Sequence, residues 1–310
     1  MSDTLITIFT APKPFTDPHI NLIQRNAIRS WVNLGGSVEV LLISDEEGVA
    51  DVAQEMDVRH LPQVECNRMG TPLISSIFKL ARMESESPFL AIVNTDILLF
   101  PNLISATQKV AEELGEFVIV GQRWDMDVRE PLNYPQNFFK ELEELVRIRG
   151  SLHSQMGSDY FIFPRDCFMN IPEFAIGRAG WDNWMIFKAR REGWKVVDAT
   201  QDILIAHQNH DYSHLAGGQP HYRQSETKEN VHLAGGEHTI FTLFDAQIRL
   251  VDGTLVKSGF SWKKFWREVE IFPLVKLKLK YFGIGFYYLF HPLRAYQDFR
   301  KVLRDRNVFK

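Results

Sequence analysis

The sequence predicts an α/β protein with a mostly parallel β-sheet that carries helices on both faces. Strand-like apolar runs alternate with amphipathic helical segments through residues 5–121, an order typical of parallel sheets covered on both sides. The 310 residues are 45% hydrophobic and 24% charged, which is ordinary for a globular protein that is long enough to bury a sizeable core. Charge is divided unevenly along the chain, so a separate C-terminal region is expected as well.

In the first half of the chain, predicted strands alternate with predicted helices. Asp17 is expected to cap the first helix, because its carboxylate can accept from free amides of the first turn, and Pro18 suits the next position. The predicted strands are residues 5–12, 37–45, 58–64, 89–93 and 117–121. The predicted helices, whose apolar residues recur on one face, are residues 18–34, 49–56, 71–81 and 101–114.

After residue 125 the regular alternation ends. Residues 207–236 are rich in histidine and glycine and are predicted to form a long loop, a kind of segment that often carries function. Residues 244–256 are predicted to form a hairpin that turns at Asp252-Gly253. The other predicted elements are helices at 136–149 and 180–191 and short strands at 158–164, 196–199 and 202–207.

The C-terminal region differs from the rest in charge. From Lys257 onward there are 13 of the 35 basic residues and 4 of the 39 acidic residues, so this region has a net charge of +9 and the preceding residues −13. We therefore predict a main domain over residues 1–256 and a basic, aromatic-rich helical tail over residues 257–310. Aromatic side chains among lysines and arginines suit an anionic membrane surface first. Packing on the acidic main domain is the second interpretation, and single-stranded nucleic acid is a distant third.

Three features bear on cellular location. The two cysteines, Cys66 and Cys167, form no metal or disulfide pattern, which fits a reducing cytosol. The start, MSDTLITIFT, lacks the basic and apolar regions of a signal peptide. No apolar stretch approaches the ~20 residues of a membrane-spanning helix. We expect a cytoplasmic protein, peripheral at the inner membrane face if its tail binds lipid.

The segment FLAIVNTDILLF, residues 89–100, is the most informative for function. Its buried strand stops at Asn94-Thr95-Asp96, and open α/β sheets bind ligands at the carboxyl ends of their strands. A carboxylate is costly to bury there unless a cation or hydrogen bonds meet it. A divalent metal that carries a diphosphate is one such cation, so the sequence predicts a sugar-nucleotide site.

Seven motifs resemble those of bacterial glycosyltransferase-like proteins of the GT-A type, the nucleotide-diphospho-sugar transferases. In chain order they are APKPF, RNAIRSW, GTPLISSIF, VNTDILL, GSDYFIFP, AIGRAGWDNWMI and HQNHDYSH. The resemblance covers roughly residues 5–255 and implies a Rossmann-related GT-A fold. It also implies transfer of a sugar from a nucleotide-diphosphate sugar to a saccharide or a lipid-linked acceptor, with Mn²⁺ or Mg²⁺ as the cofactor.

In the resembled fold, an Asp-x-Asp after the fourth strand binds the metal on the donor diphosphate. Asn94, Thr95 and Asp96 occupy this position, with Asp96 as the implied ligand. Asn94 is a departure that leaves one carboxylate fewer, so the metal would bind more weakly or need another ligand. Its amide oxygen could still accept from a ribose hydroxyl or contact the metal through a water. The resemblance implies His207, at the end of a strand, as a further metal ligand. The alternative is that Asn94 and Asp96 only cap the strand end.

Other strand ends are expected to line the donor. Thr10, Ala11 and Pro12, at the end of the first strand, should pass under the nucleotide base and ribose. Asp45 ends the second strand, where it either accepts from the base or ribose or caps the next helix. Gly70 and Thr71 precede a predicted helix whose N-terminus could face phosphate.

The segment GWDNW, residues 180–184, is the best candidate for catalysis. An inverting transferase needs a general base for the acceptor hydroxyl, and apolar walls raise the pKa of a carboxylate such as Asp182. Trp181 and Trp184 offer indole faces that stack on sugars, and Asn183 lies between them as a further acceptor contact. Asp159 is a second carboxylate in this half, suited to an acceptor contact or a structural hydrogen bond. The alternative is that Asp182 caps the helix and the tryptophans are core.

Two further clusters leave alternatives open. Asp125 and Asp127 form a true Asp-x-Asp, which could bind metal, line the acceptor cleft or be a solvated pair. His210, Asp211 and His214 follow His207 in a spacing that alone would suggest a hydrolase metal site or polar loop residues. Two rival functions also remain. A sugar-nucleotide nucleotidyltransferase would want a Gly-rich basic loop, which APKPF lacks, and a non-catalytic saccharide-binding or nucleotide-binding module is compatible with Asn94.

Overall fold

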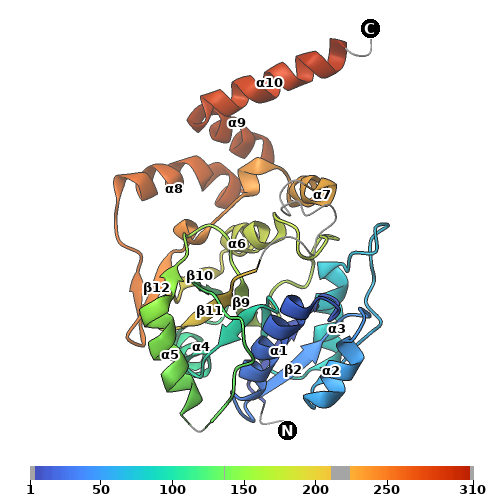
Figure 1. Ribbon diagram of the computed structural model, residues 1–310. Coiled ribbons are helices and arrows are strands. Elements are labelled where there is room, and N and C mark those ends of the chain that lie inside the picture. The colour runs from blue at the N-terminus through green and yellow to red at the C-terminus, as the bar shows by residue number, and fades with distance from the viewer. Residues whose placement is uncertain (1–3, 136, 211–223, 308–310) are drawn as a thin grey trace.

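The protein is described by a computed structural model that covers residues 4–135, 137–210 and 224–307 (Figure 1). Its main element is a nine-stranded sheet in the order β13-β12-β10-β6-β9-β4-β1-β2-β3. Every pairing in this sheet is parallel except those of β9 and β13. The predicted α/β class with a mostly parallel sheet is therefore confirmed. The strands are β1 (Ile6–Thr10), β2 (Val38–Leu42), β3 (Arg59–His60), β4 (Phe89–Val93), β6 (Phe117–Val120), β9 (Tyr160–Pro164), β10 (Lys195–Asp198), β12 (Ile248–Val251) and β13 (Thr254–Lys257).

A second, four-stranded sheet has the order β5-β11-β7-β8. Its strands are β5 (Ile97–Leu99), β7 (Trp124–Met126), β8 (Ser151–Leu152) and β11 (Ile205–Gln208). β5, β7 and β11 each follow a strand of the main sheet in the sequence, namely β4, β6 and β10. The small sheet therefore lies at the carboxyl ends of main-sheet strands, where the sequence places the candidate site. β5 and β7 were not predicted, because three residues are too few for a periodic pattern.

Helices cover both faces of the main sheet, as predicted. On one face, α1, α2 and α4 bury apolar side chains such as Trp31, Val49 and Leu103. On the other, α3 and α6 bury Ile77, Phe78 and Trp184. The Asp17 cap is confirmed, because its carboxylate accepts from His19 N and Ile20 N, each at 2.9 Å. The helices are α1 (Pro18–Val32), α2 (Val49–Glu55), α3 (Ile74–Glu84), α4 (Asn102–Glu113), α5 (Phe138–Arg149) and α6 (Trp181–Glu192).

Two local predictions are wrong. The helix expected from Thr71 begins at Ile74, because Leu73 N donates to Glu65 O at 2.9 Å and holds this segment extended. The stretch expected to be one loop contains α7 (Ser225–Ala234), a polar helix whose few apolar residues gave no signal. Residues 211–223 lie outside the described part of the chain. The predicted hairpin turning at Asp252-Gly253 is present as β12 and β13.

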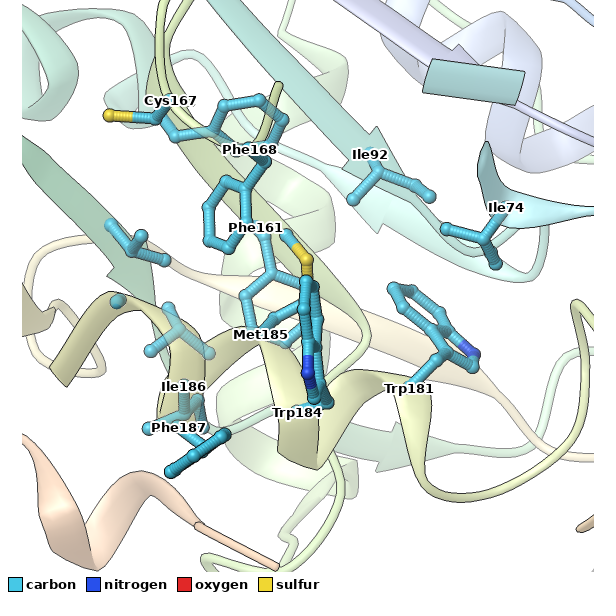
Figure 2. Packing of buried hydrophobic residues seen from close by; sticks show 14 of the residues in the cluster. Ile74, Ile92, Phe161, Cys167, Phe168, Trp181, Trp184, Met185, Ile186 and Phe187 are labelled. Atoms are coloured by element: carbon cyan, nitrogen blue, oxygen red, sulfur yellow. The ribbon is translucent and has the colours of Figure 1, made fainter. Parts of the chain in front are cut away.

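Aromatic side chains fill the core between α6 and the sheet (Figure 2). Trp181 packs edge-on against Phe161, with ring centroids 6.0 Å apart. Trp184 packs in the same way against Phe174, at 5.3 Å. Both tryptophans are buried, so much of the apolar pattern of GWDNW serves packing.

The predicted tail is helical and consists of α8 (Trp262–Val275), α9 (Lys280–Phe290) and α10 (Pro292–Asn307). Between α7 and the hairpin lie the short 3₁₀ helices η3 (Glu237–Thr239) and η4 (Leu243–Asp245). α8 lies over α6, and α10 points away from the α/β part (Figure 1). Among the described residues, no helix has the length and apolarity that crossing a bilayer requires.

Candidate functional site

Strand pairing brings Asp96 and His207 together. Asp96 lies in the short connection between β4 and β5, and His207 lies on β11, which pairs antiparallel with β5. Gln208 N donates to Asp96 O at 3.0 Å and extends this pairing to the aspartate. Two residues 111 positions apart in the sequence therefore meet because the small sheet is built on the carboxyl edge of the main one.

Asp96, His207 and His210 form a cluster that can hold a metal ion. One ligand atom of each lies within 4.8 Å of the others. Asp96 Oδ2 is 3.1 Å from His210 Nε2 and 3.9 Å from His207 Nε2. Asp96 Oδ1 is buried and has no hydrogen-bond partner among the described residues, a state that a cation would relieve. His210 is thus a second histidine at the site, whereas Asp211 and His214 lie outside the described residues.

Electrostatics favour the protonation states that metal binding needs. Burial alone would raise the pKa of Asp96, but the hydrogen bond from His210 and the nearby His207 and Lys13 outweigh it and hold this pKa well below its ordinary value. Burial lowers the pKa of His207, with the charge on Asp96 opposing this effect and Arg123 adding to it. An ionised carboxylate beside a neutral imidazole is the form that binds divalent metal.

Asp125 lies beside His207 on the neighbouring strand. The two residues are paired in the parallel register of β7 and β11, and His207 Nδ1 lies 3.3 Å from Asp125 Oδ1. Arg123 Nε at 2.9 Å and His153 Nδ1 at 2.7 Å fix the two oxygens of Asp125. His207 Nδ1 makes no hydrogen bond within the described residues, so Asp125 is an electrostatic neighbour of this ring and not its hydrogen-bond partner. Asp127 instead forms an exposed ion pair with Arg129, so the Asp125-x-Asp127 pair does not converge on one site.

The amide of Asn94 donates a hydrogen bond to Asp159, whose negative charge would repel an aspartate at position 94. Asn94 follows β4, and the antiparallel pairing of β4 with β9 sets it beside Asp159. Asn94 Nδ2 donates to Asp159 Oδ1 at 3.0 Å, and Arg123 Nη1 donates to both oxygens of Asp159 at 2.8 and 2.9 Å. An ionised carboxylate can only accept, which fixes the direction of the amide. The buried Asp159 therefore explains why this position holds Asn.

We expect the substitution Asn94→Asp to destabilise the metal-free protein. It would set two carboxylates about 3.0 Å apart with one guanidinium between them, and leaving a buried polar group unpaired costs about 1–3 kcal/mol. Because like charges raise the folded-state pKa of such a pair, the lost stability should grow as pH rises through that pKa. Thermal unfolding in EDTA at several pH values measures this. The double substitution Asn94→Asp with Asp159→Asn should restore stability, and an unaltered melting temperature in the single variant would refute the pairing argument.

Asp182 lies in the first turn of α6 and is half-buried. Burial raises the pKa of Asp182, backbone hydrogen bonds from Asn183 and Gly180 oppose this, and the negative charge of Asp159 raises it further. The sequence argument for a raised pKa therefore gave the right direction. Asp159 therefore acts electrostatically on both Asp182 and His207.

The other predicted acceptor residues have structural partners. The indoles of Trp181 and Trp184 are 6% and 7% exposed and pack in the core, so this packing argues against the predicted stacking on sugars. Asn183 Nδ2 donates to Phe241 O at 2.8 Å, which ties α6 to the segment before η4. These three residues position Asp182, because they fix the start of its helix. Their contact with an acceptor stays a prediction.

On the donor side, β1 and β2 end next to each other. Ile43 N donates to Thr10 O at 2.8 Å, and Ser44 Oγ donates to Pro12 O at 3.2 Å. Ala11 lies half-buried between them, and Asp45 is exposed. The alternative that Asp45 caps the next helix is wrong, because α2 begins after Gly48. Asp45 is therefore available to a ligand.

Gly70 and Thr71 form the end of a turn that precedes α3. Asn67 Oδ1 accepts from Thr71 N at 3.0 Å, and Gly70 adopts a φ of +81°, which favours glycine. The helix α3 begins three residues after Thr71, and contact of its N-terminus with a phosphate stays a prediction. Asn67 Nδ2 donates to Glu226 of α7 at 2.7 Å, so α7 holds this turn in place.

Two cations near the cluster were not predicted. Burial lowers the pKa of Lys13, the charge of Asp96 opposes this, and the positive charge of Arg178 lowers it further. Arg178 is itself held by Glu226, with Nε 2.8 Å from Oε2. Both residues lie inside quoted motifs, APKPF and AIGRAGW, but nothing in their local pattern separates a site cation from a surface cation. An anion between Lys13 and Arg178 would relieve their repulsion.

No family model and no curated protein matches the chain. Among solved structures, it is similar to the mannosyltransferase PcManGT from Pyrobaculum calidifontis in complex with GDP-Man and Mn²⁺, at 14% identity and TM-score 0.41 over 65% of this chain and 56% of that one. It is also similar to S. aureus TarS 1-349, at 13% identity and TM-score 0.40 over 67% and 59%. For TarS 1-349 with UDP-GlcNAc the values are 14%, 0.46, 74% and 65%. The chain spans less than two thirds of each of these proteins.

Proposed function

We propose that the protein is a metal-assisted glycosyltransferase that takes its sugar from a nucleotide-diphosphate donor. The observation that carries the proposal is the cluster of Asp96, His207 and His210 at the carboxyl edge of a parallel sheet, with a buried carboxylate oxygen that no described residue satisfies. Ligands of open α/β sheets bind at this edge. Lys13 and Arg178 add positive charge beside it, which suits a diphosphate.

The donor set fits a divalent cation and favours Mn²⁺ over Mg²⁺. One carboxylate and two imidazoles offer one oxygen and two nitrogens. Mg²⁺ prefers oxygen ligands, whereas imidazole suits the transition metals. A bound Mn²⁺ supplies charge that stabilises the leaving diphosphate. Asp125 adds negative charge beside His207, and Nε2 is the ring nitrogen of His207 that lies near Asp96.

The rest of the donor has complementary groups along the strand ends. Thr10, Ala11 and Pro12 form a wall for the base and ribose, with the exposed Asp45 as an acceptor for their hydroxyl or N–H groups. Lys13 and Arg178 take the phosphate oxygens. The amide oxygen of Asn94 faces away from its bond to Asp159 and accepts from a ribose hydroxyl.

Asp182 is the proposed general base, and the chemistry is inverting. The acceptor hydroxyl loses its proton to the Asp182 carboxylate, and its oxygen forms a bond to C1 of the donor sugar. The bond between C1 and the diphosphate oxygen breaks, and the electron pair stays on the leaving nucleoside diphosphate. A saccharide or a lipid-linked acceptor supplies the hydroxyl. The raised pKa of Asp182 makes it a stronger base than an exposed aspartate.

A nucleotide-binding screen tests this function without a known acceptor. GDP and UDP, each with Mn²⁺, with Mg²⁺ or with EDTA, are added to the whole protein, and its melting temperature is recorded. A ligand at about 100 times its Kd stabilises a protein by about 2.7 kcal/mol. We expect stabilisation only with nucleotide and metal together. Stabilisation by simple sugars alone would favour a saccharide-binding module, and pyrophosphate release from nucleoside triphosphate and sugar phosphate would favour a nucleotidyltransferase.

We expect His207→Ala and His210→Ala each to weaken Mn²⁺ affinity at least about 10-fold, or 1.4 kcal/mol. Both imidazoles face the same oxygen of Asp96, and His210 is the nearer of the two, so His210 should matter no less than His207. Calorimetric titration of Mn²⁺ measures the affinity. His232→Ala, on the exposed side of α7, is the matched control. Equally small effects on Mn²⁺ affinity from all three variants would show that His207 and His210 do not bind the metal.

A further inference from the structure

The tail helices have one face that packs on the main domain. Ile271, Leu274 and Val275 of α8 lie in the same core cluster as α6. Arg190 of α6, itself buried, donates to Glu268 at 2.7 Å. Docking on the main domain, one of the two leading interpretations of the tail, therefore holds for α8. Its outer face remains to be explained.

That outer face exposes an unusual amount of apolar surface. Trp262 is 69% exposed, Tyr281 85%, Phe282 65% and Leu293 79%. On α8 the rings form a continuous row, in which Trp262, Phe265 and Trp266 contact one another at 5.3–5.8 Å and Trp266 reaches Phe290 of α9 at 6.3 Å. Contiguous exposed apolar patches of this kind mark interaction sites.

α10 also exposes apolar and basic side chains on one side. Leu293, Tyr296, Arg300 and Leu303 follow one another at helical spacing and are all exposed, so they share one face. In Figure 1 this helix reaches away from the α/β part, which leaves its sides open.

The same region carries unpaired positive charge. Its acidic side chains are largely engaged inside the protein: Glu268 binds Arg190, Glu270 binds Arg267, and Asp298 accepts from Tyr288. Lys263, Lys276, Lys280 and Arg300 are exposed, and none of them has a carboxylate partner within the described ranges. These contacts occupy the acids of the tail, whereas the four exposed cations keep their charge free for a partner.

We propose that the outer face of α8, α9 and α10 binds the surface of an anionic lipid bilayer. Exposed tryptophan, tyrosine and phenylalanine suit the membrane interface, and lysine and arginine suit anionic headgroups. A second copy of the chain would bring the same positive charge against itself. Single-stranded nucleic acid would stack on aromatic rings but gains nothing from Leu289 and Leu293, which are 71% and 79% exposed. This surface is separate from the Asp96 cluster, so the proposal does not depend on the proposed chemistry.

Two sets of substitutions in the full chain test the proposal. The apolar set replaces Trp262, Tyr281, Phe282 and Leu293 by Ser. Its matched control replaces Met83, Ile148, Met156 and Met169 by Ser, which are 64–80% exposed and lie outside the tail. The charge set replaces Lys263, Lys276, Lys280 and Arg300 by Gln, and its control does the same to Lys140, Arg149, Lys195 and Lys228, all exposed elsewhere. All these side chains are exposed, so folding should be retained.

Co-sedimentation with phosphatidylcholine vesicles that contain phosphatidylserine measures binding. Each removed cation should lower the partition coefficient about fivefold, since it contributes about 1 kcal/mol near such a surface. Binding of the unaltered chain should also weaken with salt, because the Debye length shrinks from ~8 Å at physiological ionic strength to ~3 Å at 1 M. The apolar set should remove the salt-resistant remainder, and both controls should bind as the unaltered chain does.

Several results would overturn the proposal. They are absence of binding by the unaltered chain, equal loss in a tail set and its control, or equal binding to pure phosphatidylcholine at low and high salt. A concentration-dependent dimer that the apolar set abolishes, without vesicle binding, would assign the face to a second copy. Oligonucleotide binding with the same dependence would assign it to nucleic acid.

Discussion

Replacement of Asp96 by Asn is expected to abolish the effect of Mn²⁺ on nucleotide binding. Asp96 is the one carboxylate of the cluster, and both histidines face its Oδ2. Asparagine keeps the size of the side chain but removes the charge that the metal needs. In the unaltered protein, GDP or UDP with Mn²⁺ should raise the melting temperature by about 4 °C at ~100 times Kd. In the variant this increment should disappear.

The matched control is Asp127→Asn. Asp127 belongs to the Asp-x-Asp of residues 125–127, but its side chain is exposed and forms an ion pair with Arg129. It should therefore leave the metal effect intact. If Asp96→Asn retains a full metal-dependent shift, the metal binds elsewhere, and Asp125 is the next candidate because it lies 3.3 Å from His207. A variant that melts much earlier without ligand would call for Asp96→Glu, whose affinity for Mn²⁺ should still fall.

The carboxyl-edge location of Asp96 follows from sequence alone. An apolar run followed by Asn94-Thr95-Asp96 shows both the buried strand and the end where ligands bind. The partners of Asp96 are harder to read, because they depend on β5, β7 and β11, strands of three or four residues that pair across long sequence distances. No local periodicity marks such strands. The sequence therefore did not identify Arg123 and His153 as neighbours of the site. It also did not place His210 beside Asp96.

The tryptophans of GWDNW show a different limit. A tryptophan that stacks on a sugar and a tryptophan that fills a core look alike in a sequence, because both need an apolar face. Trp181 and Trp184 belong to the core. Only the neighbours reveal this, and they come from segments such as β9 and the residues that precede α6.

The net charge of the tail does not decide whether it binds the main domain or a membrane. Its net positive charge fits both the acidic main domain and an anionic membrane. In the structure the tail uses separate faces: α8 buries Ile271 and Leu274 against α6, while Trp262 and Phe282 remain exposed. Deleting residues 258–310 would therefore uncover core residues of the main domain. The change in charge near residue 256 marks a change in composition, and a chain cut there would lose part of its core.

Replacement of Asp182 by Asn is expected to slow sugar transfer by a factor of about 10² or more, with nucleotide and metal binding unchanged. A general base contributes about 10²–10⁴-fold, and an amide cannot take the proton of the acceptor hydroxyl. The carboxylate of Asp182 accepts from Gly180 N at 3.2 Å, and the amide oxygen of Asn can accept the same bond. The start of α6 should therefore be kept.

The pH dependence separates the base role from a structural one. Because burial raises the pKa of Asp182, the folded protein holds this proton more tightly than the unfolded chain does, so ionised Asp182 lowers stability at neutral pH. Asp182→Asn should therefore not lower the melting temperature there. Transfer by the unaltered enzyme should rise with pH through the raised pKa of Asp182, and this acidic limb should be missing from the variant. Asp166→Asn, an exposed aspartate in the same half of the chain, should change neither rate nor profile. A fully active Asp182→Asn enzyme would exclude the base role and point to a retaining reaction or to Asp159.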